Sequence, residues 1–143
     1  MEKLDIAFVI LHYLGIDDTI ECVDSIEKYV DTERYRIVIV DNCSPDNSYV
    51  SLEERYGDNP HIYVIHNTIN LGFAKGNNTG IEYLNSKYAT DFIVVANNDT
   101  CLFQGHIYNN LCNAYKMNRF AVLGPMIITS DGTCKSNPYT NGE

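Results

Sequence analysis

The chain has 143 residues, which suits one compact domain, and 45 % of them are hydrophobic, enough to form a core. Ten Lys and Arg against 19 Asp and Glu leave a formal net charge of −9. This balance argues against a general nucleic-acid or anionic-membrane surface, which needs clustered Lys and Arg. A site for an anionic ligand would therefore need a local positive group, such as a metal ion, a helix N-terminus or a single lysine.

The thiols and imidazoles show no metal-binding pattern. The five cysteines are odd in number and form no C-x-x-C pair, which disfavours a zinc site and a disulfide framework. Reduced thiols in a cytoplasmic protein are the simplest interpretation.

No signal peptide precedes the first apolar run, and no apolar run approaches the roughly 20 residues of a membrane helix. We therefore expect no transmembrane segment in this chain, with any membrane association made by parts of a longer protein.

Apolar runs alternate with helical patterns along the chain. Strands are predicted at residues 6–11, 35–41, 61–66, 92–96 and 120–129. Four helices are predicted between these strands. The first, at 16–30, has apolar residues at helical spacing, and the second is a short polar helix at about 48–56 closed by Gly57. The third contains glycines and ends near residue 86, and the fourth lies around 107–115. The alternation predicts an α/β fold with a parallel, doubly wound sheet. The run at 92–96 is expected to be a central strand covered on both faces, and Asp131-Gly132 a turn.

Three of the predicted strands end in polar side chains. These are His12 and Tyr13, then Asp41 and Asn42, and then Asn97, Asn98 and Asp99. Parallel strands share one carboxyl edge, and ligands of open α/β sheets bind just beyond it. The alternative for Asn97–Asp99 is a plain turn, because Asn and Asp side chains bond to nearby backbone groups.

Three glycines are spaced by four residues in the third predicted helix. Gly72, Gly76 and Gly80 fall on one helix face, and Lys75 is the one cation among them. Glycine in a helix interior costs about 0.5–1 kcal/mol, so a row of three needs a reason. Either a ligand approaches the backbone closely, or the helix packs tightly on the sheet.

Three motifs in order carry a resemblance to a known family. They are V-D-N-C-S-P-D at 40–46, N-L-G-F-A-K-G-N-N-T-G at 70–80 and A-N-N-D-T at 96–100. Together they resemble glycosyltransferase family 2, in its rhamnosyltransferase-like branch, and the match covers nearly the whole chain. The resemblance implies the Rossmann-like GT-A fold and inverting transfer of a hexosyl group from a nucleotide-sugar donor to a saccharide or lipid-linked acceptor. It also implies a place in cell-surface polysaccharide biosynthesis.

The resemblance also implies site residues. Asp41 matches the acid that holds the donor's base, and a pyrimidine offers the N–H that it would accept, so a UDP- or dTDP-sugar is expected. Asp99 matches the acid that coordinates Mn²⁺ or Mg²⁺ in a DXD-like motif. The remaining donor-binding positions implied are His12, Tyr13, Asn70, Gly72, Lys75, Gly76, Asn77, Asn97 and Asn98.

The chain departs from the family pattern at two points. Asn97 stands where the first acid of the D-x-D triplet is expected, which removes one charge. The family's catalytic base lies well downstream of that triplet, and neither Asp131 nor Glu143 suits the role. We therefore expect residues 1–143 to be a donor-binding domain that is incomplete at its C-terminus, with the catalytic base beyond Glu143.

Other function classes fit less well. The alternative from the binding-module class is a catalytically silent nucleotide-sugar-binding domain. A dinucleotide-dependent oxidoreductase is disfavoured because no G-x-G-x-x-G fingerprint follows the first strand. A P-loop NTPase is disfavoured because the Walker A loop is absent from the sequence.

Overall fold

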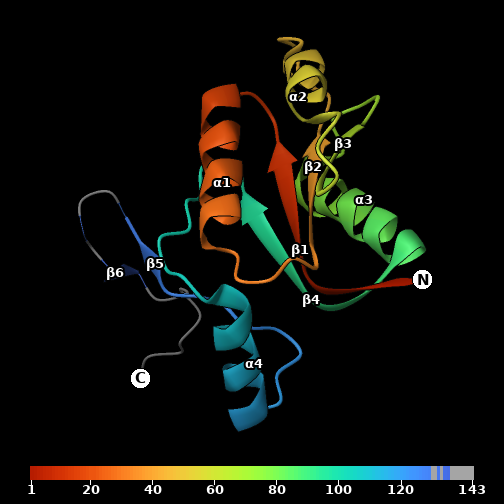
Figure 1. The fold of residues 1–143 in the computed structure, drawn as a ribbon. Helices are drawn as coiled ribbons and strands as arrows, with labels where there is room; N and C mark the ends of the chain where they lie inside the picture. Colours follow the sequence, from red (N-terminus) through yellow and green to blue (C-terminus); the bar gives the residue numbers. More distant parts are fainter. Residues whose placement is uncertain (130–131, 133, 136–143) are drawn as a thin grey trace. The chain divides into compact units, whose positions relative to one another are not determined.

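The computed structural model describes residues 1–129, 132 and 134–135 (Figure 1). They belong to two compact units, Met1–Asn110 and Leu111–Glu143. The first unit holds β1 (Glu2–His12), α1 (Ile16–Tyr29), β2 (Tyr35–Asp41), α2 (Ser48–Tyr56), β3 (Ile62–His66), α3 (Gly72–Lys87) and β4 (Tyr88–Asn97). Helix α4 (Ile107–Met117) crosses the boundary between the units, and the short strands β5 (Ile127–Ile128) and β6 (Cys134–Lys135) follow it.

The first unit is built on a parallel sheet with strand order β3-β2-β1-β4. Strand β1 lies inside the sheet, and its apolar residues Leu4 and Ile6–Ile10 are completely buried. Helices α1 and α2 connect strands that step in one direction, whereas α3 returns the chain across the sheet to β4. Because such crossovers are right-handed, α3 covers the face opposite α1 and α2 (Figure 1). This arrangement confirms the predicted α/β doubly wound fold.

Two of the three spaced glycines let α3 lie close to the sheet. A Cβ atom on Gly76 would sit 2.5 Å from Cδ1 of Leu11, and one on Gly80 would sit 2.6 Å from Cγ1 of Val9 and 2.9 Å from Cγ2 of Val40. Around Gly72 there is open space within 4 Å, and its φ of +72° favours glycine for backbone reasons. Tight packing of helix on sheet therefore explains Gly76 and Gly80.

The substitution Gly80→Ala is expected to lower the free energy of unfolding by about 1–3 kcal/mol, because the added methyl group overpacks against two buried valines. This cost outweighs the gain of up to about 1 kcal/mol that alanine brings to a helix interior. Urea denaturation of the purified chain measures it. Gly105→Ala is the control, since a Cβ there has no neighbour within 4 Å. An increase in stability for Gly80→Ala would contradict the packing explanation.

The strand predicted at 92–96 is not central. Within the described residues β4 pairs only with β1 and forms an edge of the sheet. Its side chains are half-buried or exposed over most of its length, and Val95 is 44 % exposed. An unbroken apolar run shows that a strand is hydrophobic, but the number of its partners depends on the topology. The strands buried along most of their length are β1 and β2.

The prediction of a parallel strand at 120–129 is also wrong. Only Ile127–Ile128 is extended there, and it pairs antiparallel with Cys134–Lys135 in a separate two-stranded sheet. Gly124 and Pro125 fall in the irregular stretch before it, where proline offers no N–H for a strand ladder. The antiparallel pairing of β5 with β6 agrees with the turn predicted at Asp131-Gly132, of which Gly132 is described and Asp131 lies outside the described residues. Among the described helices, none combines the length and apolar character needed to cross a membrane.

Candidate functional site at the carboxyl edge of the sheet

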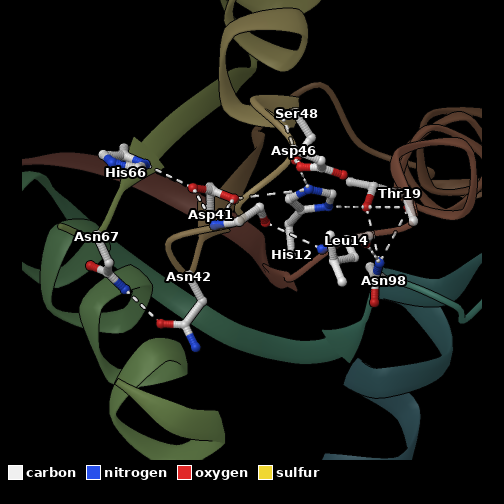
Figure 2. Close-up of polar contacts among 12 residues, drawn as sticks. His12, Leu14, Thr19, Asp41, Asn42, Asp46, Ser48, His66, Asn67 and Asn98 are labelled. Carbon is white, nitrogen blue, oxygen red and sulfur yellow. Dashed lines mark hydrogen bonds and ion pairs between the residues drawn. The ribbon is translucent and has the colours of Figure 1, made fainter. Parts of the chain in front are cut away.

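The predicted polar edge is present. In the parallel register His12 of β1 is level with Asp41 of β2, Asp41 is level with His66 of β3, and Leu11 is level with Asn97 of β4. Polar side chains from four neighbouring strands therefore lie beside one another at one end of the sheet. Figure 2 shows that these strand ends are joined by hydrogen bonds to the loops and helices that follow them.

His12 is fully buried at the centre of a chain of side-chain hydrogen bonds (Figure 2). Its Nδ1 lies 2.7 Å from Oγ1 of Thr19 in α1, and its Nε2 lies 2.7 Å from Oγ of Ser48 in α2. Ser48 Oγ lies 2.6 Å from Oδ1 of Asp46, and Asn98 Nδ2 donates to Thr19 Oγ1 at 3.2 Å.

The chemistry of these groups determines which atom donates in each of these hydrogen bonds. An ionised Asp46 only accepts, so Ser48 donates to it and accepts from Nε2–H of His12. Nδ1 of His12 accepts from the Thr19 hydroxyl at 2.7 Å, a shorter contact than the 3.3 Å between the same hydroxyl and the Gly15 carbonyl, and the Thr19 oxygen accepts from Asn98. This pattern requires a neutral imidazole. Burial lowers the pKa of His12 below its usual value, against the weaker opposing effect of Asp41 and Asp46.

Side-chain hydrogen bonds at this edge also hold the loop after β1. Leu14 and Gly15 both adopt left-handed backbone conformations, with φ of 64° and 67°. For a leucine this conformation is strained, at a cost of about 1–3 kcal/mol. Leu14 N–H donates to Ser44 Oγ at 3.2 Å, and its carbonyl accepts from Asn98 Nδ2 at 3.1 Å. The loop leaves Tyr13 46 % exposed at the strand exit.

Asp41 is buried between its neighbours. Its side chain is completely inaccessible to solvent, and Oδ2 accepts from His66 Nδ1 at 2.7 Å. The backbone N–H of Ser44 lies 3.3 and 3.4 Å from the two carboxylate oxygens, and His12 Nε2 lies 3.9 Å from Oδ1. His66 is 37 % exposed, and its ring packs on Tyr49 with centroids 4.7 Å apart.

Asn42 attaches the start of α3 to the end of β2. Its Oδ1 accepts from Asn67 Nδ2 at 3.2 Å and from the Leu71 backbone N–H at 3.0 Å. Its Nδ2 donates to Asn70 Oδ1 at 2.9 Å. Asn42 is nearly fully buried, so this network of three Asn side chains fixes the loop that leads into the glycine-containing helix.

The α3 residues of the second motif differ in their surroundings. Lys75 is exposed and forms no ion pair with any described residue. Asn77 is buried and donates to the Phe73 carbonyl at 2.9 Å, which is a contact within the helix. Gly76 packs closely against the Leu11 side chain. Of these residues, Lys75 is the one whose charged end is available to a ligand.

The Asn-Asn-Asp segment forms a turn directly after β4. The backbone N–H of Thr100 donates to the Asn97 carbonyl at 3.2 Å, and Asn98 reaches back to the loop after β1. Asp99 is exposed, and its carboxylate has no hydrogen bond or ion pair to the part of the chain that the structure describes. The backbone of Asn97–Asp99 is therefore a turn, as one of the two interpretations predicted. This turn presents the unpaired carboxylate of Asp99 at the edge of the sheet.

Sequence reasoning missed three residues of this edge. Thr19, Ser48 and His66 support His12 and Asp41, yet they lie 7, 36 and 25 positions from their partners. His66 carried a usable signal, because it ends an apolar strand as His12 and Asp41 do. Thr19 and Ser48 lie in the first turns of helices, where the sequence does not show which side chains point inward.

Comparison with known proteins identifies the family of the chain. The family model described as glycosyl transferase family 2 matches residues 8–139. The chain belongs to this family. No curated protein matches the chain at a significant level.

Solved structures share the fold of this family 2 chain at low sequence identity. Residues 1–349 of TarS from S. aureus match with a TM-score of 0.64 and 16 % identity, over 83 % of this chain and 33 % of that one. The same TarS fragment in complex with UDP-GlcNAc matches with a TM-score of 0.65. The mannosyltransferase PcManGT from Pyrobaculum calidifontis, in complex with GDP-Man and Mn²⁺, matches with a TM-score of 0.62 and 19 % identity, over 87 % of this chain and 35 % of that one. The chain thus has the GT-A fold and spans about a third of the length of these structures.

Proposed function

We propose that this chain binds the nucleotide-sugar donor of a glycosyltransferase that transfers the sugar to a saccharide or lipid-linked acceptor. The observation that carries the proposal is the meeting of the three family motifs at one edge of the sheet, through Asp41, Asn42 and Asp99. Donor complexes of two structural neighbours, with UDP-GlcNAc and GDP-Man, support it.

The available groups suit a diphosphate. Asp99 offers a free carboxylate, and Lys75 offers a free cation on the first turns of α3. The described residues contain no cluster of three metal-binding side chains. A single carboxylate nevertheless fits Mn²⁺ or Mg²⁺ brought by the donor, because such ions commonly take one or two protein carboxylates with phosphate and water. When bound, the metal ion would stabilise negative charge on the leaving diphosphate as a Lewis acid.

The finer features of the proposal come from the family resemblance. They are a UDP- or dTDP-sugar as donor, inverting hexosyl transfer, the rhamnosyltransferase-like branch and a role in cell-surface polysaccharide biosynthesis. Tyr13 is exposed at the β1 exit, where a ring packs on a nucleotide in this proposal. In the family pattern the catalytic base lies well downstream of the D-x-D triplet, so none of the donor-binding residues named here takes that role.

Calorimetric titration of the folded chain with UDP, dTDP and GDP, each with and without Mn²⁺, tests the proposal. We expect binding of a pyrimidine diphosphate that strengthens when Mn²⁺ is present. A chain that shows cooperative unfolding but binds none of the three nucleotides in either condition would refute it.

The second candidate is a nucleotide-sugar-binding domain without transferase activity. This candidate rests on the family pattern, in which the catalytic base lies outside the donor-binding motifs found in this chain. Release of UDP from a bound UDP-sugar in the presence of mixed saccharide acceptors separates the two functions. Turnover above the rate of spontaneous hydrolysis would refute the silent domain.

A further inference from the structure

Building on the proposed function, we infer that His66 contacts the base of the bound nucleotide, and that Asp41 is the positioning residue that orients the His66 imidazole. The family resemblance gives the base to Asp41 itself. The surroundings of the two side chains in this chain reverse their roles.

Asp41 has no free surface for a base. Its side chain is 0 % exposed, and it lies between His66, the Ser44 backbone N–H and His12. One carboxylate oxygen accepts the 2.7 Å hydrogen bond from His66. A base N–H would have to displace these neighbours before it reached the carboxylate.

His66 offers the exposed surface that Asp41 lacks, and Figure 2 shows its ring hydrogen-bonded to Asp41 at the end of β3. Its side chain is 37 % exposed at the end of β3. Because an ionised carboxylate only accepts, Nδ1 of His66 donates to Asp41. In the neutral ring Nε2 is then a bare acceptor, and none of the described residues hydrogen-bonds to it. Tyr49 packs against the ring and restricts its rotation.

A bare Nε2 acceptor selects for a base with a ring N–H. Uracil and thymine carry one at N3, and guanine carries one at N1. Cytosine has a lone pair at N3, which would oppose the Nε2 lone pair. A site built around one hydrogen-bonding group discriminates against the analogue that lacks its partner. The inference thus restricts the donor to nucleotides whose base has a ring N–H, which are those of uracil, thymine and guanine.

The distance along the sheet edge also fits. His66 ends β3 and Asp99 follows β4, at the two ends of the strand order β3-β2-β1-β4. Three steps between neighbouring strands amount to about 14 Å at the usual strand spacing. That separation is of the order of an extended nucleoside diphosphate, with its base at His66 and its phosphates at Asp99.

Titration with UDP and CDP in the presence of Mn²⁺ tests the assignment, because the two ligands differ only in the base. In the substitution His66→Asn, the amide N–H takes the place of Nδ1 beside Asp41, while Nε2 is lost. We expect wild type to prefer UDP over CDP, and His66→Asn to lose about 3- to 10-fold in UDP affinity, the usual worth of one hydrogen bond. The UDP/CDP ratio should fall towards one.

His61→Asn is the matched control, since His61 precedes the other end of β3 and stacks on Tyr35. It is expected to keep the wild-type ratio. An unchanged ratio in His66→Asn, or a wild type that does not distinguish UDP from CDP, would overturn the role of His66 and leave nucleotide binding standing. A folded wild type that binds neither ligand would overturn the proposed function, and the inference with it.

The positioning role of Asp41 has a separate spectroscopic test. Nitrogen-15 NMR of the free protein at pH 8 should show His66 as the Nδ1–H tautomer, and Asp41→Asn should increase the Nε2–H tautomer because the asparagine amide can donate to Nδ1. UDP affinity should fall in the same variant. A wild-type His66 in the Nε2–H form would overturn the inference, because Nε2 would then be a donor.

Discussion

Replacing Asp99 by asparagine is expected to abolish the metal-dependent part of nucleotide binding. Asp99 presents the one carboxylate of the DXD-like turn, and it is exposed without a hydrogen bond or ion pair to the described residues. The neutral amide keeps the shape and an oxygen but removes the charge that attracts a divalent cation. We expect UDP affinity in Mn²⁺ to fall at least about tenfold, or about 1.4 kcal/mol of binding free energy.

Two further variants make this prediction specific. Asn97→Asp restores a second carboxylate at the start of the same turn and is expected to increase the effect of Mn²⁺ on UDP affinity. Asp58→Asn removes an exposed carboxylate from the turn after α2 and should leave binding unchanged. Calorimetric titration with and without Mn²⁺ measures all three. Metal-dependent binding that survives in Asp99→Asn would show that Asp99 does not hold the ion.

The sheet of the first unit could be predicted from the sequence because its strands are short apolar runs with clear ends. The prediction for β2 matches the structure residue for residue, and those for β1 and β3 identify the correct strands. Parallel pairing then brings the strand exits to one edge without further information, and this made the grouping of His12, Asp41 and Asn97 predictable. The strand order was harder to predict from the sequence. Strands β1 and β4 have similar apolar runs, but of these two only β1 is buried on both faces.

The contacts within the site could not be predicted in the same way. The sequence places Asp41 at a strand exit, but its burial depends on His66, Ser44 and His12, which approach from three different segments. The role of a strand-end carboxylate changes when its neighbours cover it. The sequence therefore predicted which strand ends share the edge, whereas the contacts between Asp41 and His66 could be seen only in the structure.

The substitution His12→Leu is expected to destabilise the chain more at pH 8 than at pH 5.5. At pH 8 the neutral imidazole joins Thr19 to Ser48, and its loss should cost about 1–3 kcal/mol of unfolding free energy, because two hydrogen bonds inside the sheet edge disappear. Leucine has a similar size, so the comparison limits the effect of a cavity.

The pH dependence follows from the pKa of His12, which burial lowers in the folded protein from a usual value of 6.5. Above pH 6.5 the imidazole is neutral in both states, and its full contribution to stability is present. As the pH falls below 6.5 the unfolded chain takes up a proton that the folded protein resists, so this contribution declines, by at most 1.36 kcal/mol per pH unit. The leucine variant lacks this term, and its stability should approach that of wild type in acid. Urea denaturation at both pH values measures the difference, and an equal cost at pH 5.5 and pH 8 would show that burial does not hold His12 neutral in the folded protein.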